Sequence, residues 1–88
     1  MPLFTDALIG DTTHLSAEEF GSYLLILIAT WRNNGISIVD DDVRMSRIAR
    51  VSLKTWRQRM RTSLSPFFNL SEGAWEQKRL RKEWAKLQ

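Results

Sequence analysis

Three absences narrow what this chain of 88 residues can be. It has no cysteine, so it forms neither a disulfide nor a thiolate metal site. Its four glycines are scattered at positions 10, 21, 35 and 73, which argues against a glycine-rich phosphate loop. Its longest hydrophobic run covers seven residues, 23–29, whereas a membrane-spanning helix needs about 20. We therefore expect one small cytoplasmic domain with no membrane contact and no cofactor.

Candidate metal ligands and catalytic groups are also few. The single histidine, His14, could bind a metal only together with Asp6 and Asp11, in a segment without a clear pattern. The acidic run at residues 40–42 could bind Mg²⁺, but helix capping explains it fully. No pairing of a nucleophile with a base is evident. The sequence predicts no metal site and no enzyme activity.

Charge is divided unevenly along the chain. Residues 1–42 hold one base and seven acids, a net charge of −6, and residues 43–88 hold twelve bases and three acids, a net charge of +9. The net charge of the whole chain is only +3, because the two halves largely cancel. A strongly cationic half makes a chain a candidate for binding polyanions through that half.

The strongest local signal is a helix over residues 16–33. Ser16 and Glu19 form a capping box at its start, and Gly35 is suited to a left-handed cap after its end. The helix is apolar on nearly every side, which is typical of a central core helix or of one that shares a face with another chain. A short extended segment, residues 36–39, follows it.

Two further helices within residues 40–64 predict a helix-turn-helix. We expect Asp40 to cap the first, residues 40–50, and Ser52 to cap the second, residues 52–64. The connection between them is about three residues long, as in a helix-turn-helix. The second helix has an apolar stripe at helical spacing, formed by Leu53, Trp56, Met60 and Leu64.

The remaining segments predict a wing. Pro66 ends the preceding helix, residues 67–77 have the pattern of a β-hairpin around Gly73, and residues 78–87 form a basic helix. Its inner side is expected to hold Leu80, Trp84 and Leu87. With residues 36–39 as a third strand, the order predicts a mainly α-helical winged helix-turn-helix with a small three-stranded sheet. Its parts are an N-terminal arm (1–15, with helical turns within 3–9), a core helix (16–33), the helix-turn-helix (40–64), a wing hairpin (67–77) and a C-terminal helix (78–87).

Basic and amide side chains of these segments form a candidate DNA-binding surface. The set comprises Arg44, Arg47, Arg50, Lys54, Arg57, Gln58, Arg61, Lys78 and Arg79. Such groups neutralise phosphates, so binding is expected to be weak and salt-sensitive, and Arg57, Gln58 and Arg61 are also placed to reach base edges. The alternative is a solvated basic face. Trp75 could instead stack on single-stranded bases, although its spacing is more typical of a core residue.

Four motifs together resemble a known family. They are D-T-x-H-L-S-x-E-E-x-G from Asp11, the pair Trp31-Arg32, R-I-A-R-x-S from Arg47, and a double phenylalanine followed by W-x-x-K-R from Trp75. Over essentially its whole length the chain resembles the YdaU-type prophage family, a domain of unknown function. The resemblance implies a component of a phage or prophage replication module and supplies no catalytic residue. It also implies that other members are longer, with an extension resembling replication-initiation proteins.

Charge, element order and resemblance favour a phage-related nucleic-acid-binding module. We expect a DNA-replication accessory or regulatory protein that binds the DNA backbone through the helix-turn-helix and wing. The rival hypothesis is a non-catalytic interaction module of the same fold. In that case the acidic, apolar N-terminal half would form a homodimer or bind a replication protein.

Overall fold

The structure, a computed structural model, describes residues 12–70 and 73–87. The helical turns predicted within residues 3–9 and the tip of the predicted hairpin loop lie outside these ranges. In chain order the elements are α2 (Ala17–Arg32), β1 (Ile38–Val39), α3 (Asp42–Ala49), α4 (Leu53–Thr55), the π-helical turn η1 (Trp56–Met60), α5 (Arg61–Leu64), the 3₁₀ turn η2 (Ser65–Phe67), β2 (Ala74–Trp75) and α6 (Lys78–Lys86). The fold is mainly helical with a small two-stranded sheet. None of the described helices has the length and hydropathy needed to cross a membrane.

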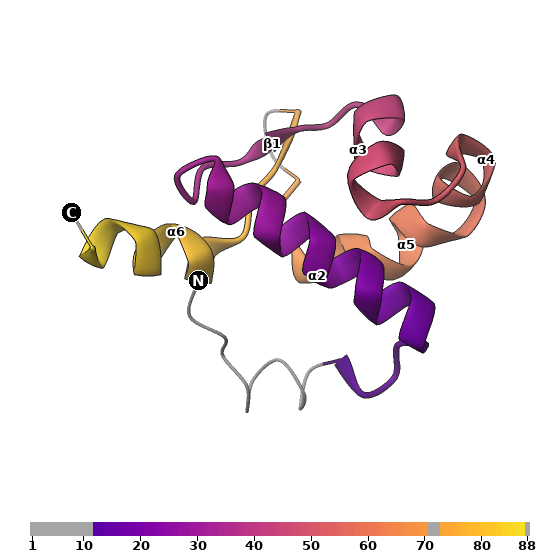
Figure 1. Cartoon of the computed structure of the whole chain (residues 1–88), viewed down its shortest axis with the longest axis horizontal. Coiled ribbons are helices and arrows are strands. Elements are labelled where there is room, and N and C mark those ends of the chain that lie inside the picture. The colour runs from indigo at the N-terminus through magenta and orange to yellow at the C-terminus, as the bar shows by residue number, and fades with distance from the viewer. Residues whose placement is uncertain (1–11, 71–72, 88) are drawn as a thin grey trace.

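Helix α2 is the central element. It crosses the front of the molecule, with α3, α4 and α5 toward one end and α6 toward the other (Figure 1). The predicted capping box is confirmed: Glu19 N–H donates to the Ser16 hydroxyl (3.1 Å), and Ser16 N–H donates to the Glu19 carboxylate (2.8 Å). Tyr23, Ile26 and Leu27 are buried, so the apolar helix forms the core of the single chain.

The end of α2 is shaped by its contact with α6. Asn34 and Gly35 both have positive φ, at 60° and 70°. A Cβ on Gly35 would lie 2.7 Å from the Cβ of Trp84, so only glycine lets the two helices approach this closely. Trp31 and Trp84 meet edge to face with ring centres 5.0 Å apart. Leu87, predicted to lie on the inner side of this helix, is instead 67% exposed, because α6 ends at Lys86.

The sheet is smaller than predicted. β1 and β2 pair antiparallel, with Ile38 opposite Trp75. The prediction of a third strand was wrong within the described residues: a single bridge between Asn69 and Glu76 stands in its place. The helix before it continues into η2, because Pro66 has a φ that suits the first positions of a helical turn. Too few residues then remain for an extended strand.

The two helices after β1 are joined by a tight turn, as predicted. The first begins at Asp42, with Asp41 as its N-cap, so the prediction that Asp40 caps it was wrong. Arg50 follows it with φ 60°, the left-handed conformation that usually favours glycine. Ser52 then caps α4 by accepting a hydrogen bond from Thr55 N–H (3.1 Å), as predicted.

Candidate nucleic-acid interface

The residues predicted to contact DNA do not form one surface. Five of them are exposed on the helices and turn at one end of the molecule: Arg47, Arg50, Lys54, Arg57 and Gln58. Lys78 and Arg79 are exposed at the start of α6. Arg44 is exposed but lines a groove between α3, β1 and α2, and Arg61 is half-buried. The structure thus separates four of the nine predicted residues from the five at the turn.

The inward position of Arg61 follows from the π-helical turn η1. In a regular α-helix Arg61 would be rotated by about 140° from Trp56, on the outer side. Arg61 N–H instead donates to the carbonyl of Trp56, five residues earlier. The one extra residue in this turn rotates the next helical segment back by about 100° and brings Arg61 toward the buried face of Trp56. The expectation that Arg61 reaches base edges assumed a regular helix and does not match this placement.

Arg61 is held inside by two carboxylates and an indole ring. Its guanidinium makes a bidentate pair with Asp40 (2.6 and 2.8 Å) and a further bond to Asp42 (3.2 Å). It also lies 5.5 Å from the ring centre of Trp75, at the range of a cation–π contact. Paired guanidinium and carboxylate groups with this geometry are stronger than ordinary surface ion pairs.

The same carboxylates also accept hydrogen bonds from the N–H groups of two buried indole rings. Trp75 donates to Asp40 (2.9 Å) and Trp56 donates to Asp42 (3.1 Å). The two indole rings pack with centres 5.4 Å apart and are fully buried. The pKa of Asp40 falls from its ordinary 3.8 to about 2, mainly because Arg61 donates to it; burial opposes this and the Trp75 bond adds to it. We call Asp40, Asp42, Trp56, Arg61 and Trp75 the inner polar cluster.

Trp75 is a core residue and not a candidate for stacking on bases, because it is buried. Its exposed fraction is 0%, and it packs edge to face against Phe68 and at a tilt of 48° against Trp56. An aromatic ring that is closed off on all sides offers no face for stacking. The suggestion that Trp75 stacks on single-stranded bases was therefore wrong.

The acidic groups of residues 40–42 that could hold a metal are used elsewhere, and Asp6 and Asp11 lie outside the described residues. Asp40 and Asp42 bind Arg61, and Asp41 accepts from Val43 N–H at the start of α3 (3.0 Å). No group of three or more possible ligand side chains occurs in the part of the chain that the structure describes. His14 is exposed, and its ring stacks on Phe67 at 5.6 Å.

Ion pairs also restrain two outer arginines. Arg57 donates to Asp42 (3.3 Å), and Arg59, which was not part of the predicted set, donates to Glu18 (2.9 Å). Their side chains are 58% and 51% exposed, so each pair is weak and a phosphate could displace the carboxylate.

Three cations around the turn have no such partner. Within residues 12–70 and 73–87, no carboxylate pairs with Arg47, Arg50 or Lys54. They fall at the end of α3, in the turn and in α4, so they are close along the chain as well as exposed. We call Arg47, Arg50 and Lys54 the turn cations. These three residues therefore form one group of uncompensated positive charge, located at the turn itself.

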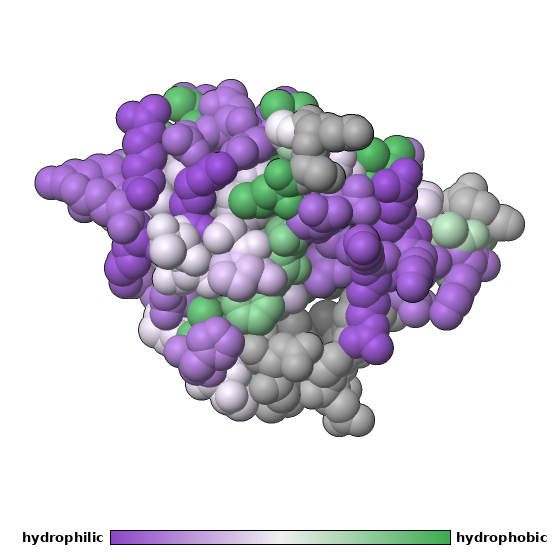
Figure 2. Space-filling view, turned by 180° about the vertical axis from the view of Figure 1, so that it is seen from behind, coloured by the Kyte–Doolittle hydropathy of each residue, from purple (hydrophilic) through white to green (hydrophobic). Residues whose placement is uncertain are grey.

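A second cationic region lies on α6. Arg81 pairs with Glu76 and Lys86 with Glu83, while Lys78 and Lys82 have no carboxylate partner in the described ranges. Seen from behind, hydrophilic side chains flank a central strip where hydrophobic residues reach the surface (Figure 2). The two basic regions therefore lie toward opposite ends of the molecule, because α4 and α6 do (Figure 1).

Comparison with known proteins places the chain among relatives without an assigned activity. A family model described as "Protein of unknown function (DUF1376)" matches residues 1–85. The chain is 34% identical over 85 residues to "Uncharacterized protein YdaU" of Escherichia coli (strain K12), which covers 97% of this chain and 28% of that relative. The chain thus spans less than a third of the relative's length. No solved structure matches it.

Proposed function

The chain belongs to the family of unknown function DUF1376, and we propose that it is a winged helix-turn-helix protein that binds the backbone of double-stranded DNA. The observation that carries the proposal is the set of turn cations, which are exposed and lack carboxylate partners among the described residues. The proposal is for a binding protein and not for an enzyme.

The element order supports the proposed fold. α2, β1, α3, a three-residue turn, the helix from α4 to α5, and then β2 follow one another as in a winged helix. The bridge between Asn69 and Glu76 extends the pairing beyond β2 and stands where a winged helix has its third strand. In this fold the second helix of the helix-turn-helix enters the major groove while the first helix crosses the backbone, so the turn between them is near phosphates.

The chemistry favours phosphate contacts over base reading. The turn cations suit phosphate oxygens, and Lys78 and Arg79 lie next to β2, where a wing would add further contacts. Of the three side chains expected at base edges, Arg61 is held by Asp40 and Arg57 is restrained by Asp42. Gln58 alone is exposed without a described charge partner, so low sequence specificity is expected.

The proposed setting is a phage or prophage DNA transaction. It rests on the resemblance to the YdaU-type prophage family, since the E. coli relative is itself uncharacterised. Within that setting we assign the domain an accessory or regulatory role in replication. The rival function is docking of a replication protein or a second copy, favoured by exposed apolar side chains such as Ile28 (43%) on α2.

A salt titration tests the DNA proposal. Duplex DNA affinity is measured at several salt concentrations for the wild type, for Arg47, Arg50 and Lys54 changed to Gln, and for a control triple on α6 with Arg81, Lys82 and Lys86 changed to Gln. Each lost phosphate contact should reduce the magnitude of the slope of log K against log salt by about 0.9. For the turn variant, which loses three cations, this magnitude should therefore fall by roughly 2–3. The control removes the same charge at the other end of the molecule and should change the slope by less than about 1.

Two results would decide against the proposal. Wild-type affinity that does not depend on salt would exclude phosphate binding, and equal losses in both triples would indicate diffuse attraction without a site. Sedimentation at several protein concentrations addresses the rival function. A stable dimer without salt-sensitive DNA affinity would favour the interaction module.

A further inference from the structure

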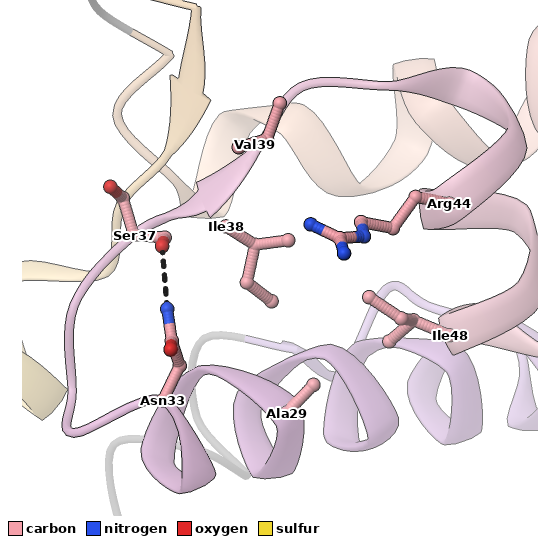
Figure 3. A pocket seen from close by; sticks show the side chains of 7 residues that line it. All are labelled: Ala29, Asn33, Ser37, Ile38, Val39, Arg44 and Ile48. Carbon is pink, nitrogen blue, oxygen red and sulfur yellow. Dashed lines mark hydrogen bonds between the residues drawn. The ribbon is translucent and has the colours of Figure 1, made fainter.

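A groove beside α3 has a composition unsuited to DNA. It lies between α2, β1 and α3 and has a volume of about 250 Å³ (Figure 3). Ala29, Ile38 and Ile48 point into it from the three elements, and Asn33 and Ser37 lie at its end. An apolar floor with neutral ends offers phosphates little, since the protein surfaces that bind nucleic acids are strongly positive.

One charged side chain enters this groove. Arg44 extends from α3 across the opening toward β1, above Ile38 and Ile48 (Figure 3). It is exposed and pairs with no carboxylate in the part of the chain that the structure describes. By contrast, Arg57, Arg59 and Arg61 on the neighbouring helix all have carboxylate partners. A lone guanidinium over an apolar floor is complementary to a carboxylate next to an apolar side chain.

The strand at the groove offers a second kind of contact. β1 has β2 on one edge, and no described strand pairs with its other edge. Apolar side chains are exposed along this segment, with Ile36 at 51% and Val39 at 58%. On this edge the carbonyls of Ser37 and Val39 already accept from the Asn33 side chain (3.1 Å) and from Asp41 N–H (2.9 Å). An extended peptide could therefore bond there only to backbone N–H groups, while its alternate side chains enter the groove.

We propose that this groove binds an extended segment of a partner protein that carries a carboxylate close to an apolar side chain. The carboxylate pairs with Arg44, and the apolar side chain lies on Ile38 and Ile48. A volume of about 250 Å³ is below the roughly 300 Å³ at which small-molecule sites begin, and it suits one or two side chains. The inference goes beyond the proposed DNA binding and uses a different arginine.

Arg44 and Arg47 form a matched pair for the test. They lie one helical turn apart on α3, both are exposed, and only Arg44 lines the groove. A displayed library of random twelve-residue peptides is selected on the wild-type protein and counter-selected on Arg44→Gln. Enriched sequences should place Asp or Glu within two positions of an apolar residue. Synthesised versions should bind Arg44→Gln at least ten-fold more weakly than wild type, and Arg47→Gln within two-fold of it.

DNA affinity of the same two variants separates this inference from the proposed function. Arg47→Gln should lower the salt slope for DNA, and Arg44→Gln should leave it nearly unchanged. Enriched peptides should also shift the NMR signals of the Ala29 and Ile38 methyl groups. If Arg44→Gln does not fold, Val39→Glu, at a 58% exposed position on the groove, takes its place, because its carboxylate repels that of the peptide and competes for Arg44.

Several outcomes would overturn the inference. These are no enrichment, enriched peptides without an acidic residue, equal binding to both arginine variants, or unmoved methyl signals. Methyl shifts that depend on protein concentration alone would show that a second copy of the chain occupies the groove. None of these results bears on the DNA titration, which can succeed or fail separately.

Discussion

Replacing Asp40 with Asn tests the inner polar cluster directly. The substitution keeps the shape and the acceptor for Trp75 but removes the charge that pairs with Arg61 at 2.6 and 2.8 Å. The structure gives the magnitude: lowering the pKa of Asp40 from 3.8 to about 2 corresponds to about 2 kcal/mol in favour of the charged form. Asp40 and Arg61 are 21% and 32% exposed, so screening by water reduces this only in part. We expect Asp40→Asn to lower the free energy of unfolding at pH 7 by about 2 kcal/mol.

The neighbouring Asp41→Asn is the control, because it removes the same charge one residue away. Asp41 makes a helix N-cap, and Asn caps a helix as well as Asp does, so its cost should stay within about 0.5 kcal/mol. Both variants and the wild type are unfolded in urea, with tryptophan fluorescence as the readout.

The pH dependence gives a second check. A carboxyl whose pKa is lowered by folding stabilises the protein above its unfolded pKa and loses this contribution as pH falls through the folded pKa. For Asp40 the loss therefore falls between about pH 4 and pH 2. The difference between wild type and Asp40→Asn should shrink by about 1 kcal/mol from pH 5 to pH 3. Equal cost for the two Asn variants at pH 7, or a difference that does not vary with pH, would refute the role assigned to the Asp40–Arg61 pair.

Two backbone positions give further predictions. Gly35→Ala places a Cβ at a φ of +70° and 2.7 Å from the Cβ of Trp84, so it should lower the free energy of unfolding in urea by about 2–4 kcal/mol. Gly73→Ala is the control: its φ is +69° but the space around it is open, so its cost should be about 1 kcal/mol. Equal costs would contradict the close approach of α6 to α2. Arg50→Gly should raise the melting temperature by about 2–4 °C, because it relieves a left-handed arginine, while lowering DNA affinity by removing a turn cation. A lower melting temperature would show that the Arg50 side chain stabilises the turn more than its backbone conformation costs.

Local signals predicted most of the helices. The capping box at Ser16 and the cap at Ser52 depend on residues three apart in the chain, and the structure has both. Gly73 has the positive φ that the hairpin pattern required. These features depend on short-range chemistry, so a single sequence contains enough information to place them.

The π-helical turn could not be predicted, because hydrophobic spacing assumes a constant helical period. The buried stripe of Trp56, Met60 and Leu64 is compatible with a regular helix, and nothing in that pattern signals an extra residue in the turn. The interactions that favour it are tertiary: Asp40 and Asp42, about twenty residues earlier, bind the guanidinium of Arg61. The predicted third strand failed for a related reason, since Pro66 is as compatible with a 3₁₀ turn as with a helix end.

The uneven charge along the chain acquires a structural explanation from these pairs. Glu18, Asp40 and Asp42, from the acidic half, bind Arg57, Arg59 and Arg61 from the basic half. These pairs leave the turn cations, together with Arg44 at the groove, without carboxylate partners at that end of the described chain. Because the Arg61 pair also anchors both indole N–H groups, the acids that neutralise the helix fix its position relative to β2. Because the π-helical turn η1 rotates the helix, fewer of its basic side chains face outward than the sequence predicted. The proposed DNA contacts are therefore made by the turn before this helix and not by its middle.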